Sequence, residues 1–254
     1  MATSDANLIA VAHGTPANDS AALRVLRRID AGNCTAVRGA GPQFVSEGCY
    51  DTNHPTGDCA EGDWCSMGRI GYFDGLSRKR LGLRSSFDAH ILAPLQRDVL
   101  RYTWLHERYN CQGAQATQRT AAYFEFPSVV AMLTREVRYG IDVGIGRVAV
   151  EPFLPSPARF TFSVGDVRVD YRGAGSAAAA EGVVLRLPGA PGLRRKYRIG
   201  GMRPGQRFNV SASGAGCGAL ALGTAAVADA AGLLRFSAPG GPGCEVSALA
   251  HLAR

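Results

Sequence analysis

The sequence of 254 residues is long enough to bury a hydrophobic core and holds one large domain or two small ones. Hydrophobic residues make up 46% of it and charged residues 19%, which is ordinary for a globular protein. No apolar run reaches the roughly 20 residues that cross a membrane, so we expect no membrane partner.

The formal net charge of +7 raises the question of nucleic-acid binding. Basic residues are spread along the chain, apart from two triplets at Arg78–Arg80 and Arg194–Lys196. No nucleic-acid-binding motif accompanies either triplet, so we expect no nucleic-acid partner. The arginine bias, together with abundant alanine and glycine, is typical of a GC-rich bacterial coding sequence.

Seven cysteines are many for a cytosolic enzyme and favour an exported or periplasmic protein, although Met1–Ala12 shows no recognisable signal peptide. The sequence leaves the disulfide connectivity open; Cys217 and Cys244 form the best candidate pair because both lie in the β-rich half. The alternative to disulfides in the first half is a zinc site, although its four residues have no C-x-x-C spacing. They are Cys49, His54, Cys59 and Cys65. We expect no metal and no cofactor.

The first half of the chain is predicted to be helical. Asp19 or Ser20 is expected to cap a helix that runs to about Asp30, with an irregular stretch at 32–62 after it. Apolar residues recur at helical intervals over 64–81, where three glycines indicate close helix packing.

Two more helices are predicted further along. Residues 86–105 repeat apolar side chains every four positions, and an irregular loop follows at 109–123. The last helix begins near Phe126, with Pro127 in its first turn, and Gly140 ends it.

After Gly140 the hydrophobic period changes to two, with Pro and Gly turns between short runs. This pattern predicts a β-sandwich, and we place the boundary near residue 145, giving a helical part at 1–145 and a β part at 146–254. Strands are expected at 147–153, 159–164, 167–171, 183–187, 196–199, 207–210, 219–222, 233–237 and 245–249.

Three segments resemble six-hairpin (α/α)6-barrel glycoside hydrolases. Val129–Ile141 is similar to their last barrel helix, and Val148–Pro155 to the strand with a proline that follows it. Tyr102–Tyr109 resembles the Thr–Trp–Glu segment of α-L-rhamnosidase-like members, with two extra residues between Trp104 and Glu107. A full barrel has twelve helices, and about four are predicted here. The resemblance therefore implies the C-terminal part only: a partial (α/α)6 toroid followed by an antiparallel β-sandwich.

The same resemblance implies hydrolysis of an O-glycosidic bond, which needs two carboxyl groups. Glu107 is the first catalytic candidate because it falls near the family's general base; an ion pair with Arg108 or Arg101 is the alternative. Asp63 is the second because it precedes Trp64, whose indole suits a sugar face, although Asp63 would also cap a helix.

Aromatic and polar residues near these two acids are the substrate-binding candidates. They are Trp64, Trp104, Arg108, Tyr109, Tyr123 and Glu125. Three helical acids are predicted to be surface charges: Asp74, Asp88 and Asp98. The expected partner is a carbohydrate substrate, and the alternative function is a non-catalytic carbohydrate-binding or structural fragment. No Gly-x-Ser-x-Gly, P-loop or dinucleotide-binding motif is present.

Overall fold

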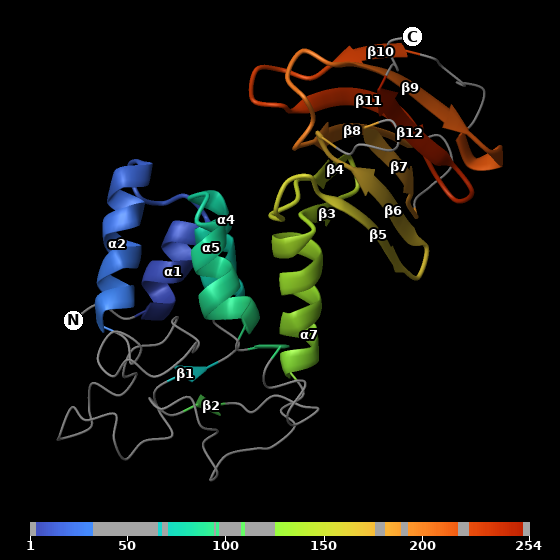
Figure 1. The fold of residues 1–254 in the computed structure, drawn as a ribbon. Coiled ribbons are helices and arrows are strands. Elements are labelled where there is room, and N and C mark those ends of the chain that lie inside the picture. The colour runs from blue at the N-terminus through green and yellow to red at the C-terminus, as the bar shows by residue number, and fades with distance from the viewer. Residues whose placement is uncertain are drawn as a thin grey trace. The chain divides into compact units, whose positions relative to one another are not determined.

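The computed structural model describes residues 4–32, 66–67, 71–93, 95–96, 108–109, 125–175, 181–188, 193–217 and 224–250. The chain divides into two compact units, residues 1–137 and 138–254. Within the described residues, the first unit is mainly helical and the second is built of strands (Figure 1). The change from helical to alternating periodicity near residue 145 thus falls eight residues after Val137, the last residue of the first unit.

The helical unit contains short helices. They are α1 (Ser4–Ala12), α2 (Asp19–Gly32), α4 (Gly71–Arg80), α5 (Arg84–Phe87) and α7 (Glu125–Met132), with π-helical turns η3 (Asp88–Leu92) and η4 (Leu133–Arg138). Two short strands, β1 (Ser66–Met67) and β2 (Arg108–Tyr109), pair antiparallel. No described helix is both long and apolar enough to span a bilayer.

The side chain of Asn18 caps the N-terminus of helix α2 by accepting a hydrogen bond from a backbone amide. Oδ1 of Asn18 lies 2.9 Å from the amide nitrogen of Ala21, so Asn18 supplies the cap expected from Asp19 or Ser20. Leu26 and Ile29 are buried one helical turn apart and pack with Leu8 of α1. The amphipathic pattern of residues 19–30 therefore predicted both the helix and its buried face.

The predicted partial (α/α)6 toroid is wrong. In the described part of the chain most elements are strands in two sheets, and the five α-helices are short, the longest being 14 residues. The helical periodicity of 64–81 suggested an apolar face. Helix α4 instead begins at Gly71 and buries Asp74 and Arg78. Periodicity shows which side of a helix avoids water, so it located helices without giving their number, their neighbours or their arrangement.

The second unit consists of strands in two sheets. They are β3 (Ile141–Val143), β4 (Arg147–Val150), β5 (Arg159–Val164), β6 (Val167–Arg172), β7 (Gly182–Arg186), β8 (Leu193–Ile199), β9 (Arg207–Ser213), β10 (Thr224–Val227), β11 (Leu234–Gly240) and β12 (Glu245–Ala250). A 3-10 turn, η5 (Ala215–Cys217), precedes β10.

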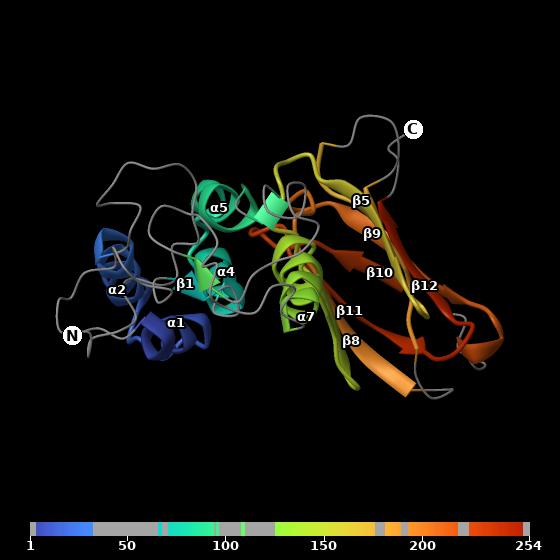
Figure 2. The ribbon, with the colours of Figure 1, turned by 90° about the horizontal axis from the view of Figure 1, so that it is seen from below.

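The larger sheet has the order β10-β9-β12-β7-β6-β5 and the smaller one β11-β8-β4-β3 (Figures 1 and 2). Neighbours pair antiparallel except β4 and β8, which are parallel with Val148 opposite Tyr197. The expected purely antiparallel sandwich is corrected in this respect. Buried and exposed side chains alternate along β8 and β9, because one face of each strand packs against the interior.

One hydrophobic core joins the two sheets. Val150, Tyr197 and Leu234 enter it from the smaller sheet, and Val169 and Phe208 from the larger one. Side chains from both sheets are therefore removed from water together, which is what makes the two-sheet arrangement stable.

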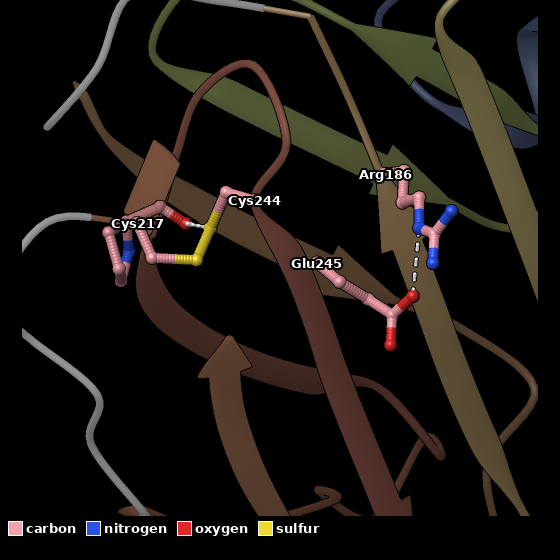
Figure 3. Close-up of a disulfide and its surroundings, with 5 residues drawn as sticks. Arg186, Cys217, Cys244 and Glu245 are labelled. Atoms are coloured by element: carbon pink, nitrogen blue, oxygen red, sulfur yellow. Dashed lines mark hydrogen bonds and ion pairs between the residues drawn. A yellow bond between two sulfur atoms is a disulfide. The ribbon is translucent and has the colours of Figure 1, made fainter. Parts of the chain in front are cut away.

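The Cys217–Cys244 disulfide is part of this buried core (Figure 3). Cys217 ends η5 and Cys244 immediately precedes β12, and their Cα atoms lie 4.8 Å apart. This confirms the pair favoured by the sequence. The four residues of the alternative zinc site lie outside the described residues, and the described ones hold no cluster of metal-ligating side chains.

Candidate functional site

The predicted catalytic and substrate-binding residues occupy segments that the structure describes only in part. Arg108 and Tyr109 form strand β2, and Glu125 is the first residue of α7. The remaining candidates lie outside the described residues: Asp63, Trp64, Trp104, Glu107 and Tyr123.

Strands β1 and β2 bring two of these segments together. Ser66 pairs with Tyr109 and Met67 with Arg108. Ser66 follows Asp63 by three residues in the sequence, and Arg108 follows Glu107 directly. Backbone pairing thus links the chain segment that carries the first catalytic candidate with the one that carries the second.

A buried ionic cluster, formed by Asp30, Asp74, Arg78 and Ser86, lies in the same unit. Nε of Arg78 lies 2.8 Å from Oδ1 of Asp74, and its Nη2 lies 2.8 Å from Oδ1 of Asp30 on α2. Nη1 of Arg78 also donates to Oγ of Ser86 on α5. The guanidinium of Arg78 on α4 therefore contacts α2 through Asp30 and α5 through Ser86. It also pairs with Asp74, one turn earlier on α4 itself.

Burial changes the pKa of Asp74 within this cluster. Asp74 and Arg78 are fully buried, whereas the Asp30 side chain is 35% exposed. Burial raises the pKa of Asp74 to about 6, since desolvation outweighs the attraction of Arg78. The predicted surface position of Asp74 is therefore wrong. The sequence did contain a signal of this burial, namely an Asp and an Arg four residues apart on a helix that also contains glycine.

His90 of η3 lies within the electrostatic reach of the cluster. Burial lowers its pKa, and the positive charge of Arg78 lowers it further. Its Nδ1 is buried with no hydrogen-bond partner among the described residues. His90 therefore favours the neutral imidazole at neutral pH.

Each residue of the first basic triplet, Arg78–Arg80, contacts another part of the protein, although Arg80 is exposed. Beside the buried Arg78, Nζ of Lys79 donates to the carbonyl oxygen of Glu136 at 2.8 Å. Nη1 of Arg80 donates to the carbonyl oxygen of Val11 at 2.7 Å. The three cations therefore contribute contacts between helical elements of this unit.

Helix α4 packs closely against its neighbours. A Cβ added at Gly75 would lie 2.8 Å from Cδ2 of Leu133 and 3.1 Å from Cε2 of Phe87. Close contact was the reason expected for the glycines of this segment, and Gly75 confirms it. Oγ of Ser77 adds a 3.1 Å hydrogen bond to the carbonyl oxygen of Leu8 on α1.

These contacts define what the ionic cluster can do. Asp74 has no exposed surface and so cannot touch a substrate. Its interactions fix α2, α4 and α5 relative to one another, and α4 begins four residues after the end of β1. The cluster is thus a rigid support in the unit that also contains the β1–β2 ladder.

Comparison with known proteins adds no relative to this description. No protein-family model matches the sequence. No curated protein matches it either.

Proposed function

We propose that this chain is a carbohydrate-active protein that hydrolyses an O-glycosidic bond, with Asp63 and Glu107 as the pair of carboxyl groups. The supporting observation is the β1–β2 ladder, which pairs the segment just after Asp63 with the segment just after Glu107. Two acids far apart in the sequence must approach each other for this chemistry, and strand pairing between their segments is one means of achieving that.

In the proposed reaction one carboxylic acid protonates the oxygen of the leaving sugar. The other carboxylate activates a water molecule or attacks the anomeric carbon directly. Trp64, Trp104 and Tyr109 supply aromatic faces for the sugar ring, and Arg108, Tyr123 and Glu125 supply polar contacts. The ionic cluster around Arg78 supports this site without entering the reaction.

A panel of aryl glycosides incubated with the purified chain tests the proposal. We expect release of the aryl alcohol from at least one member. Glu107→Gln and Asp63→Asn are each expected to lower the rate by about 10²–10⁴-fold, the usual contribution of a general acid or base.

Asp166→Asn is the matched control, because Asp166 is exposed in the turn between β5 and β6 of the other unit. It removes one carboxylate from the protein and is expected to leave the rate unchanged. Absence of hydrolysis throughout the panel, or equal rates for all three variants, rejects catalysis. Glycan binding without hydrolysis would instead favour the non-catalytic alternative.

A further inference from the structure

The excess positive charge of the chain belongs to the second unit. Residues 138–254 contain 14 arginine and lysine residues against seven aspartate and glutamate residues, a difference of +7. Residues 1–137 contain 14 of each kind, so their formal charges cancel. An imbalance confined to one unit creates a positive potential there, which attracts anionic ligands.

The outer face of the smaller sheet gathers several of these cations around a groove. Burial along β8 alternates, so Arg194, Lys196 and Arg198 point outward while Arg195 and Tyr197 point inward. The groove has a volume of about 530 Å³, within the range of small-ligand sites. Its lining includes Asp142, Arg147, Ala149, Lys196, Arg198 and Arg235.

Strand register places like charges opposite each other in this groove. Arg147 on β4 is paired with Lys196 on β8, and Arg235 on β11 is paired with Arg198 on β8. Neighbouring strands lie about 4.8 Å apart and alternate residues along a strand about 6.6 Å apart. The four cations therefore form a compact zigzag across three strands, with Arg147 on one side of β8 and Arg235 on the other. Directly opposed like charges destabilise a sheet, and a bound anion would remove that repulsion.

The carboxylates nearby neutralise only part of this charge. Arg147 pairs with Asp142 at 3.3 Å, and Arg235 with Asp229 at 2.6 Å. Arg198 pairs with Glu151. Lys196 has no carboxylate partner among the described residues, and neither has Arg194.

A buried cation lies on the other side of the same strand. Arg195 is 4% exposed, and its Nη1 has no hydrogen-bond partner in the described part of the chain. Its Nε and Nη2 donate to backbone carbonyl oxygens of Ile145 and Pro188. Arg195 therefore adds to the positive potential of β8 from beneath the groove.

The composition of the groove separates acidic sugars from nucleic acids. Across the sheet one row runs Asp142, Ala149, Arg198, Arg235, so that a carboxylate, a small side chain and two cations lie side by side. A sugar acid has hydroxyl groups that donate to Asp142 and a carboxylate that accepts from the arginines. A DNA phosphodiester backbone offers acceptors only, so it has no proton for the Asp142 carboxylate, which Arg147 already pairs at 3.3 Å.

Two aromatic residues, Tyr197 and Phe236, also line the groove. Tyr197 is buried, and Phe236 is half-buried and stacks on it at 4.9 Å between ring centroids. Neither ring is fully exposed, so the described strands β3, β4, β8 and β11 offer no row of open rings on which successive bases could stack.

We infer that this groove binds an acidic polysaccharide, a polymer of sugars bearing carboxylate groups. The inference does not depend on glycosidic hydrolysis by the first unit, because every residue that carries it belongs to residues 138–254. A chain with an inactive first unit is expected to bind in the same way.

The test compares two double variants of the full chain. Arg147→Ser with Lys196→Ser removes two cations of the groove, and Arg159→Ser with Arg207→Ser removes two exposed cations from the larger sheet. Both reduce the formal net charge equally, so any difference between them reports the position of the charge. Equal melting temperatures establish that both variants fold.

Isothermal titration calorimetry with polygalacturonate is the readout, with dextran as the neutral polymer and duplex DNA as the alternative polyanion. We expect the groove variant to weaken polygalacturonate binding by about tenfold or more, from the loss of two charged contacts, and the control variant by less than about twofold. Dextran should not bind. Equal loss in both variants, no binding by the unaltered chain, or tighter binding of DNA would overturn the inference.

Discussion

Nε of Arg78 donates a 2.8 Å hydrogen bond to Oδ1 of Asp74, one helical turn earlier on α4, and neither side chain is exposed to solvent. Removing one member of such a pair leaves the other as an uncompensated buried charge. The stability of the helical unit therefore depends on this single contact more than on any surface ion pair that the structure describes.

Arg78→Met is expected to destabilise the helical unit by about 3–5 kcal/mol, because the Asp74 carboxylate then stays buried without its cation. Adding Asp74→Leu should restore part of this loss, since the double variant buries no charge at that position. Hydrogen exchange resolved by peptide reads the helical unit separately. A double variant less stable than Arg78→Met would contradict the interpretation.

The raised pKa of Asp74 predicts an unusual pH dependence. The folded pKa of Asp74 is about 6, above the ordinary value of 3.8. Between these two pH values Asp74 therefore keeps a proton in the folded protein that it has lost in the unfolded chain. Its stabilising contribution is complete below about pH 4 and is lost as pH rises through 6, a difference of about 3 kcal/mol.

Asp74→Asn isolates this effect, because an amide keeps the shape of the side chain and has no such proton to lose. Relative to the unaltered protein, the stability of this variant should rise between pH 4 and pH 7. The opposing contribution of His90 is common to both proteins and cancels. A fall in this difference between pH 4 and pH 7 would instead mean that Arg78 holds the pKa of Asp74 below its ordinary value.

Two glycines with left-handed backbones provide a matched pair. Gly140 has φ of +66°, and a Cβ there would lie 1.9 Å from the carbonyl oxygen of Glu151. Gly165 has φ of +56°, and nothing lies within 4 Å of the corresponding position. Gly165→Ala should cost about 1–2 kcal/mol from backbone strain alone. Gly140→Ala should cost about 1–3 kcal/mol more, from overpacking against backbone. Urea denaturation of both variants measures the difference, and equal losses would show that the clash is relieved by movement.

The Cys217–Cys244 disulfide closes a loop with a sequence separation of 27 residues. Replacing both cysteines by serine is expected to destabilise the sandwich by about 3.5 kcal/mol, through the added freedom of the unfolded chain. A reducing agent should lower the melting temperature of the sandwich in the unaltered protein and leave that of the double variant unchanged. An identical response of both would assign the effect to other cysteines.

Local pattern was sufficient for much of the second unit. The alternating runs at 159–164 and 167–171 became β5 and β6 with nearly the predicted bounds, because side chains along most of each strand alternate between more and less exposed positions. Strands β3 and β10 were missed for local reasons. Ile141–Val143 is too short to show a period, and Thr224–Val227 is half alanine, which has little preference for strands.

The sequence by itself determined most of the longer helices and strands, though not α1, β3 or β10. It also determined where Gly140 ends the last helix and which cysteine pair was favoured in the sandwich. Only the tertiary structure decided how the helices pack and that Asp74 is buried beside Arg78. It also decided that β4 lies parallel to β8, which opposes Arg147 to Lys196. Periodicity records which side of an element avoids water, whereas the identity of its neighbour depends on contacts between residues far apart in the chain.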